Sequence, residues 1–292
     1  MPTYSIKDLE NLTGIQAHTI RIWEQRYNLL FPERTPTNIR RYSDKDLRKL
    51  LSVSLLNNNG LKISKVAKMS DSDITSAVFQ LSEGKDYKIE SQIENLKLIM
   101  VEMNEAKFEK QFSHLVLQLG IEETIMKVLI PFFKRLNYLW QTSSVTVAQS
   151  NFITTLFKQK LCVAIDGLEP ADKIDGKTFI FFLPKSEQSD YGLLFCNYLA
   201  KKRKFQTIYL GASLPSEELA DILAKYPNSH LVSVASLAKI DLTEYYSEVL
   251  QACSENQKLL ITGSQTNTVK ISDPRLVIFK EYTEFQTFLE QI

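Results

Sequence analysis

The spacing of apolar residues changes twice along the chain and divides it into three zones. Up to about residue 72, short apolar patterns are interrupted by the segment FPERTPTNIRRYS. From there to about residue 170, apolar residues recur at helical spacing with almost no Gly or Pro, as in FEKQFSHLVLQLG. Beyond residue 170 the pattern shortens to brief continuous apolar runs. We therefore predict three domains, comprising residues 1–72, 73–170 and 171–292.

The middle zone predicts a helical bundle. Its helical pattern continues through EETIMKVLIPFFKRLNYLW and VAQSNFITTLFKQKLCVAI, and Gly120 and Gly167 mark helix ends. Four helices that each bury one face pack most simply as a four-helix bundle.

The third zone predicts a parallel sheet. Its five apolar runs are KTFIFFL, FQTIYLG, HLVSVAS, KLLITGS and RLVIFK. Most of them are separated by helical stretches, among them GLLFCNYLAKK and LTEYYSEVLQAC. Continuous apolar strands that alternate with helices indicate a sheet covered on both faces. We expect a five-stranded flavodoxin-like domain with its ligand site at the carboxyl ends of the strands. The predicted fold class is a multidomain α and α/β protein.

The first zone predicts two short helices joined by a tight turn at Gly14. Ser5 can cap the first helix, and the second runs from about residue 16 to residue 27. Helical spacing places three residues of the second helix in the core, namely Ile20, Trp23 and Tyr27. The residues left facing outward are His18, Thr19, Arg21, Ile22 and Gln25. Two short helices, the second basic on its open face, fit a helix-turn-helix that reads the major groove.

An extended hairpin follows these helices and carries Arg34, Arg40 and Arg41. Ser43 then caps another helix with Asp46 at its third position. Arginines on a projecting loop suit contact with phosphates. From the residues alone, the alternative is a small helical domain with a solvated basic face.

Charge distribution favours a polyanionic partner for the N-terminal zone. The chain has a net charge of +1, but residues 1–70 carry 12 Lys and Arg against 6 Asp and Glu, and the remainder carries 23 against 28.

Apolar runs too short to span a bilayer and an N-terminus with no apolar signal segment predict a cytoplasmic protein with no membrane partner. The three Cys and three His are scattered, so no metal site and no catalytic residue is predicted.

The N-terminal zone resembles the MerR family of bacterial transcription regulators. The resemblance is carried by AHTIRIWEQRYNLLFPERTPTNIRRYSDKDLRKL and extends over nearly all of residues 3–70. It implies that Thr19, Arg21 and their neighbours on the second helix contact DNA. It also implies contacts to the DNA backbone from the wing, through Arg34, Arg40, Arg41 and Tyr42. MerR-type proteins are dimers on two-fold sites, so self-association is implied, with promoter DNA and RNA polymerase as further partners.

Residues from about 75 to 290 resemble the cobalamin-binding module of light-responsive MerR-type regulators and of methionine synthase. The family motif Asp/Glu-x-His-x-x-Gly appears here as Glu187, Ser189 and Gly192, so serine replaces the histidine that ligates cobalt. In the bundle the family has Trp, nine residues and Glu-His. Here Trp140 is followed, after nine residues, by Ser150 and Asn151, so the second histidine is also replaced.

The substituted positions predict a body that no longer ligates cobalt. A serine hydroxyl or an asparagine amide is a poor donor to a transition metal compared with imidazole. Glu187 would orient the histidine in the family, and here it has no histidine to orient. Ser236 and Gly263 lie where the family holds the nucleotide tail, or they form ordinary strand-end turns. We expect no cofactor, although cobalamin can still bind through contacts to its ring and tail.

Three functions remain open from the sequence. The first is a DNA-binding regulator, expected to be a repressor, whose body oligomerises or senses another effector. The second is a regulator that binds cobalamin and responds to light. The third is a cobalamin-dependent methyl carrier, against which the missing ligands and the lack of paired catalytic groups argue. A pocket formed by Trp140, Ser150, Asn151, Glu187, Ser189, Gly192, Ser236 and Gly263 is the candidate effector site.

Overall fold

The computed structural model describes residues 3–83, 89–142, 144–169 and 177–292. The predicted boundary between residues 170 and 171 lies outside these ranges. The chain forms two compact units, residues 1–156 and residues 157–292. Within the described residues, no helix combines the length and the apolar character needed to cross a membrane.

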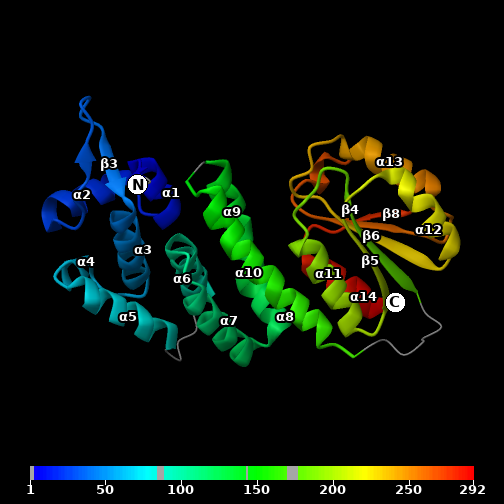
Figure 1. The fold of residues 1–292 in the computed structure, drawn as a ribbon, viewed down its shortest axis with the longest axis horizontal. Coiled ribbons are helices and arrows are strands. Elements are labelled where there is room, and N and C mark those ends of the chain that lie inside the picture. Colours follow the sequence, from blue (N-terminus) through cyan, green and yellow to red (C-terminus); the bar gives the residue numbers. More distant parts are fainter. Residues whose placement is uncertain (1–2, 84–88, 143, 170–176) are drawn as a thin grey trace. The chain divides into compact units, whose positions relative to one another are not determined.

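The head of the first unit is a small antiparallel sheet with three helices (Figure 1). In chain order its elements are β1 (Thr3–Tyr4), α1 (Ile6–Thr13), α2 (Ala17–Tyr27), β2 (Glu33–Arg34), β3 (Arg40–Ser43) and α3 (Asp44–Asn58). Ser5 and Ser43 begin α1 and α3, each with a capping box closed by an aspartate three residues later. Gly14 ends α1 in the left-handed conformation, with φ of 72°. Both predicted caps and the predicted turn are therefore confirmed.

Helices continue through the rest of the first unit. They are α4 (Ile63–Val66), α5 (Asp71–Glu83), α6 (Ile89–Glu102), α7 (Glu105–Leu119), α8 (Ile121–Thr124), the π-helical turn η1 (Ile125–Leu129) and α9 (Ile130–Gln141), followed by α10 (Val147–Asp166), which begins in the first unit and ends in the second. Because α8, η1 and α9 follow one another without a break, the predicted four-helix pattern is present as α6, α7, α8–α9 and α10. Phe108, Phe112 and Leu115 are buried on one face of α7, as the helical spacing predicts.

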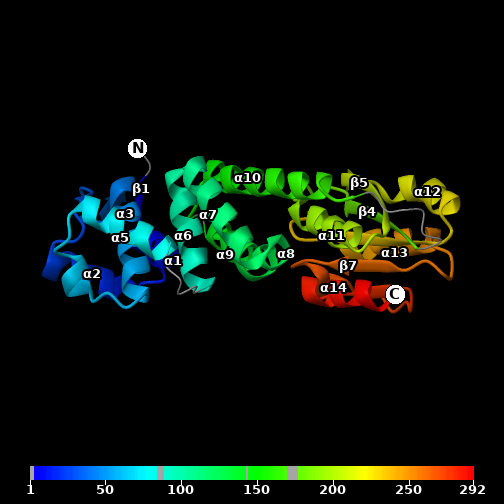
Figure 2. The same ribbon diagram turned by 90° about the horizontal axis from the view of Figure 1, so that it is seen from below.

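The head and the bundle are joined inside the first unit, where α3 packs against both α5 and α6 (Figures 1 and 2). The ammonium of Lys97 donates to the carbonyl oxygen of Leu12 at 3.1 Å and pairs with the carboxylate of Glu94 at 2.8 Å. The side chains of this ion pair are only 7% and 10% exposed. A second link runs from the amide of Asn11 to the hydroxyl of Ser144 at 3.1 Å. The predicted domains 1–72 and 73–170 thus share a buried polar contact.

The second unit is the predicted parallel sheet with helices on both faces (Figure 1). Its strands are β4 (Thr178–Pro184), β5 (Gln206–Leu214), β6 (Ser229–Val234), β7 (Leu259–Thr262) and β8 (Leu276–Ile278). The strand order β5-β4-β6-β7-β8 is the flavodoxin-like order, and every pairing is parallel. The fold class predicted from the sequence is confirmed.

Two helical layers cover the sheet. Residues of α12 (Leu219–Lys225) and α13 (Leu242–Ala252) pack in one apolar cluster with Ile180, Phe182 and Leu231 of the strands. On the other face, α11 (Tyr191–Lys202) contacts α14 (Tyr282–Gln291) through the rings of Phe195 and Tyr282. The carboxyl ends of β4, β6 and β7 lie at one edge, where the loops of the candidate cofactor site meet.

Candidate nucleic-acid interface

The outer face of α2 is basic and accessible. Ile20 and Trp23 are buried, so the predicted assignment of Trp23 to the core is confirmed. Tyr27, predicted to be buried, is half-buried. The outward residues of α2 are His18, Arg21, Ile22, Gln25 and Arg26, all exposed, and Thr19, which is half-buried. The sequence reasoning missed Arg26, whose guanidinium lies 5.5 Å from the centre of the Tyr27 ring. Arg26 comes three residues after the buried Trp23 and lies at the edge of the buried face, so helical spacing did not single it out as an outward residue.

A carboxylate on the inner side of α2 fixes this helix to the hairpin. The guanidinium Nε of Arg40 lies 3.1 Å from both carboxylate oxygens of Glu24, and the hydroxyl of Tyr42 donates to Glu24 Oε2 at 3.1 Å. Burial, together with the Glu24 carboxylate, raises the pKa of Tyr42. Glu24 therefore positions α2 relative to β3.

Of the residues predicted to contact DNA, Tyr42 and Arg40 make contacts within the head, and the contact of Arg40 with DNA stays a prediction. Tyr42 has no exposed surface, so its side chain does not reach the outside of the head, and the prediction for it is wrong. The side chain of Arg40 is 21% exposed and is paired with Glu24, so it anchors β3 to α2. Side chains alternate along β3, the central strand of the small sheet, so Arg40 and Tyr42 face the same inner side, which a pattern of basic residues alone does not reveal.

The tip of the hairpin carries the accessible arginines. The turn is closed by a hydrogen bond from the backbone N–H of Thr35 to the carbonyl of Ile39, and Asn38 has φ of 61°. Arg34 is exposed and donates to Asn38 Oδ1 at 2.6 Å, and Arg41 is exposed on β3. The face formed by α2 and the hairpin thus presents cations suited to phosphate contact beside a helix able to enter a major groove.

The loop after β4 is held by a buried carboxylate. Glu187 has no exposed surface, and its Oε1 accepts a hydrogen bond from the backbone N–H of Ser189 at 2.9 Å. Its Oε2 accepts from the backbone N–H groups of Ser236 and Leu237 at 2.9 Å and 2.6 Å. In place of a histidine, Glu187 thus binds backbone N–H groups, and it ties the loop after β4 to the loop after β6.

Neighbouring contacts close the same edge of the sheet. The hydroxyl of Ser186 accepts a hydrogen bond from the backbone N–H of Lys239 at 2.9 Å. The side-chain amide of Gln265 accepts from the backbone N–H of Ala238 and donates to its carbonyl oxygen. Ser236 and Ser189 are half-buried in these loops. The loops therefore hold one another through their own polar groups.

Both glycines of the predicted effector pocket are sites of close approach within the chain. A methyl group on Gly192 would collide with the hydroxyl of Tyr282 on α14, and it would crowd the side chain of Val234. Gly263 has φ of 116°, and a methyl group there would collide with the backbone of Ala235. These glycines allow the sheet edge to pack tightly.

The other predicted pocket residues lie in the first unit. Trp140 is near the end of α9, Ser150 is half-buried in α10, and Asn151 is exposed. Glu187, Ser189, Gly192, Ser236 and Gly263 belong to the second unit. The single pocket predicted from all eight residues thus draws on two units, and it stays a prediction. Among the residues the structure describes, no group of three or more His, Cys, Asp or Glu side chains is placed to hold a metal ion.

Comparison with known proteins defines the class of the molecule. Residues 4–73 match the family model described as MerR HTH family regulatory protein. The head is a MerR-type helix-turn-helix domain, the chain is a DNA-binding transcriptional regulator, and its body has a fold like that of a corrinoid protein.

The similar proteins match this chain over different lengths. The HTH-type transcriptional repressor CarH of Myxococcus xanthus is 23% identical over 291 residues, which cover 94% of each chain. The HTH-type transcriptional regulator MlrA of Salmonella typhimurium is 34% identical over 73 residues, 25% of this chain and 30% of that protein. Among solved structures, the monomethylamine corrinoid protein of Methanosarcina barkeri is similar in fold, with a TM-score of 0.56 and 16% identity. The match covers 70% of this chain and 100% of that chain.

Proposed function

We propose that the protein is a repressor that binds promoter DNA as a homo-oligomer, with α2 in the major groove and the hairpin against the phosphates. The observation that carries this proposal is the exposed basic face of α2, held to the hairpin by Glu24. The relative that matches along 94% of the chain is named as a transcriptional repressor, which supports repression over activation. Self-association and a contact with RNA polymerase at the promoter are parts of the same proposal.

We further propose that the body does not ligate cobalt through the position of Ser189. A serine hydroxyl is a weak donor to cobalt, and Glu187 already accepts three hydrogen bonds from backbone N–H groups. The hydroxyl of Tyr282 lies directly beside Gly192. These residues do not fit a histidine-ligated corrinoid, so no step of the proposed function passes through one.

In this proposal the protein is not an enzyme. Its relatives over most of the chain are named as transcriptional regulators. The polar side chains at the carboxyl edge of the sheet are engaged in loop contacts, as described for Glu187, Ser186 and Gln265. A methyl carrier would need a ligated cobalt at this edge.

Nuclease footprinting on the DNA upstream of the protein's own gene tests the DNA-binding part. We expect a protected site with two-fold symmetry, and we expect the protein to reduce transcription from that promoter in a purified system. Protection without symmetry would contradict binding by a homodimer. Increased transcription would contradict repression.

Gel filtration with hydroxocobalamin tests the statement about cobalt. We expect the corrin absorbance to elute with the free cofactor and not with the protein. Co-elution at close to one corrin per chain would instead favour a cobalamin-binding regulator, the alternative that the sequence left open.

A further inference from the structure

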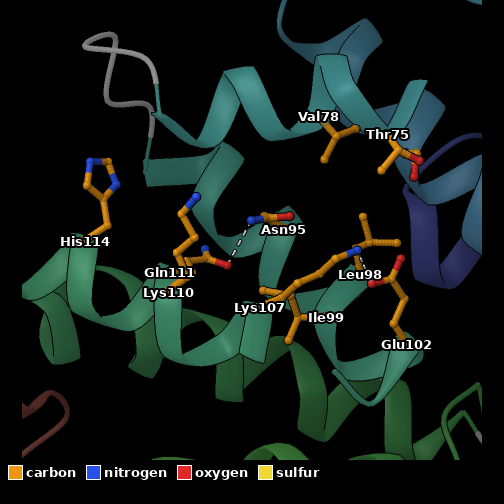
Figure 3. Close-up of a pocket in the computed structure, with 11 residues that line it drawn as sticks. Thr75, Val78, Asn95, Leu98, Ile99, Glu102, Lys107, Lys110, Gln111 and His114 are labelled. Carbon is orange, nitrogen blue, oxygen red and sulfur yellow. Dashed lines mark hydrogen bonds and ion pairs between the residues drawn. The ribbon is translucent and has the colours of Figure 1, made fainter. Parts of the chain in front are cut away.

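A cavity of about 350 Å³ lies within the first unit. Its walls come from α3 of the head and from α5, α6 and α7 (Figure 3). A volume of this size is in the range of small-molecule binding sites. The groups that line the cavity, and the partners they already have within the chain, therefore decide which kind of molecule fits.

The buried part of the lining is mainly apolar. Val78 of α5 and Leu98 and Ile99 of α6 are 8%, 4% and 1% exposed, and all three line the cavity. In Figure 3, Val78 projects from α5 toward the side of the cavity that α6 forms. These side chains favour a ligand with an apolar body, because its hydrocarbon leaves water when it binds.

The charged groups of the lining are engaged within the chain. Lys107 pairs with Glu102 at 2.6 Å, and His114 Nε2 is hydrogen-bonded to the side-chain amide of Gln118 at 2.9 Å. Lys110 also has an interaction within the chain. A charged ligand would therefore lose water without gaining an ionic partner of its own, so the lining favours an uncharged molecule.

A series of amide hydrogen bonds fixes which polar atom is turned to the cavity. Gln111 Nε2 donates to the backbone carbonyl of Gln92 at 2.9 Å, and a carbonyl can only accept, so the amide of Gln111 has one orientation. Gln111 Oε1 then accepts from Asn95 Nδ2 at 2.9 Å. Among the residues that the structure describes, none donates to Asn95 Oδ1. In Figure 3 this oxygen points away from Gln111, toward the side where Val78 and Leu98 lie.

The hydroxyl groups of the lining donate to their own helices. Ser52 Oγ donates to the carbonyl of Arg48 at 3.0 Å, and Thr75 Oγ1 donates to the carbonyl of Asp71 at 2.9 Å. These two oxygens and Asn95 Oδ1 can therefore accept a hydrogen bond from a ligand. The lining thus calls for a ligand that donates.

We propose that this cavity binds an uncharged molecule with an apolar body and one hydrogen-bond donor, such as an alkylphenol. The apolar body lies against Val78, Leu98 and Ile99, and the hydroxyl donates to Asn95 Oδ1. Burial of hydrocarbon supplies most of the affinity, and the hydrogen bond fixes the orientation of the ligand.

The test is titration calorimetry of the full chain with 4-propylphenol in the absence of DNA, so its outcome is separate from that of the proposed function. We expect saturable binding of one molecule per chain. The anion 4-propylbenzoate and the cation 4-propylbenzylammonium have the same apolar body, and each should bind at least about tenfold more weakly at neutral pH. Propylbenzene, which lacks the donor, should bind about fivefold more weakly.

Asn95→Leu tests the hydrogen bond. Leucine removes Oδ1 and covers Gln111 Oε1 with a side chain of similar size. We therefore expect 4-propylphenol to lose its advantage, so that it and propylbenzene bind this variant equally well. If Asn95 only supported the structure, both ligands would be weakened by the same factor.

Val78→Phe tests the location. It adds a ring to the apolar wall and should weaken the binding of 4-propylphenol by about tenfold or more. Ser76→Phe is the matched control, because it places the same ring at an exposed position of α5 outside the cavity lining. It should change the affinity by less than about twofold.

Circular dichroism and melting temperature establish that the variants are folded. If Val78→Phe proves unstable, the comparison of the two ligands on Asn95→Leu decides the question alone. The proposal is overturned if 4-propylphenol does not bind saturably or if either charged compound binds equally well. It is also overturned if Asn95→Leu weakens both uncharged ligands by the same factor, or if Val78→Phe and Ser76→Phe affect binding equally.

Discussion

Single carboxylates hold together segments that are far apart in the sequence. Glu24 joins α2 to β3 through Arg40 and Tyr42, and Glu187 joins the loops after β4 and β6 through backbone N–H groups. The sequence predicted the segments but not these links. A local pattern records which residues are polar, whereas the partner of a buried carboxylate depends on the tertiary fold.

Arg21 belongs to the exposed face of α2, where a side chain can reach base edges. We expect Arg21→Ala to change the preference for one base position, by roughly 1–3 kcal/mol if the guanidinium binds a guanine. Fluorescence anisotropy on a panel of duplexes, each with one altered base pair, measures this. An equal loss of affinity on every duplex would show a phosphate contact instead.

The imidazole of His230 makes the stability of the sheet domain sensitive to pH. His230 is 6% exposed, its Nδ1 accepts from the backbone N–H of Lys258, and burial lowers its pKa from 6.5 to about 4. The folded state therefore favours the neutral ring. This stabilisation is complete above about pH 6.5 and is lost as the pH falls toward 4, by up to roughly 3 kcal/mol.

Replacing His230 by asparagine keeps an acceptor close to the position of Nδ1 and removes the titration. We expect the free energy of unfolding in urea to fall less for His230→Asn than for the wild-type protein between about pH 7 and pH 4.5. Parallel pH curves for the two proteins would contradict this assignment.

At the scale of elements, the sequence predicted most of the architecture correctly. The capped helices of the head, the four helical segments of the bundle and the five strands all follow from apolar spacing and cap residues. The parallel, doubly covered sheet followed from continuous apolar strands that alternate with helices. The tight packing at Gly192 was not predictable, because it depends on Tyr282, ninety residues further along the chain.

Gly192 is the site where α11 approaches α14. We expect Gly192→Ala to destabilise the second unit by roughly 1–3 kcal/mol, because the new methyl group meets the hydroxyl of Tyr282. Adding Tyr282→Phe removes that oxygen and should recover part of the loss. Gly167→Ala is the control, since a methyl group there makes only ordinary contacts, the nearest at 3.5 Å. Equal effects of the two alanine substitutions on the unfolding free energy would refute the steric explanation.

The ion pair of Lys97 and Glu94 links α6 of the bundle to α1 of the head. Lys97→Met removes the donor to the Leu12 carbonyl and the nearest cation of Glu94, whose pKa burial raises. We expect a loss of about 3–5 kcal/mol in the free energy of unfolding. Lys127→Met, which breaks an exposed ion pair with Glu123, should cost less than about 1 kcal/mol. Similar losses for both variants would mean that this buried contact does not stabilise the first unit.

At the scale of the whole molecule, a MerR-type DNA-binding head is followed by a body with the fold of corrinoid proteins. The sequence identified both parts from motifs. It placed the effector pocket between residues of the bundle and of the sheet, and that pocket stays a prediction.

The most direct test of the account is an anisotropy titration of the full chain against the duplex upstream of its own gene, over a range of salt concentrations, with and without hydroxocobalamin. We predict tight binding at low salt and a linear fall of log affinity with log salt. Arg41→Ala should reduce the slope by about one. Hydroxocobalamin should leave the curves unchanged. No binding at low salt would contradict DNA binding by the head. A shift of the curves by hydroxocobalamin would contradict the proposal that the body does not ligate cobalt.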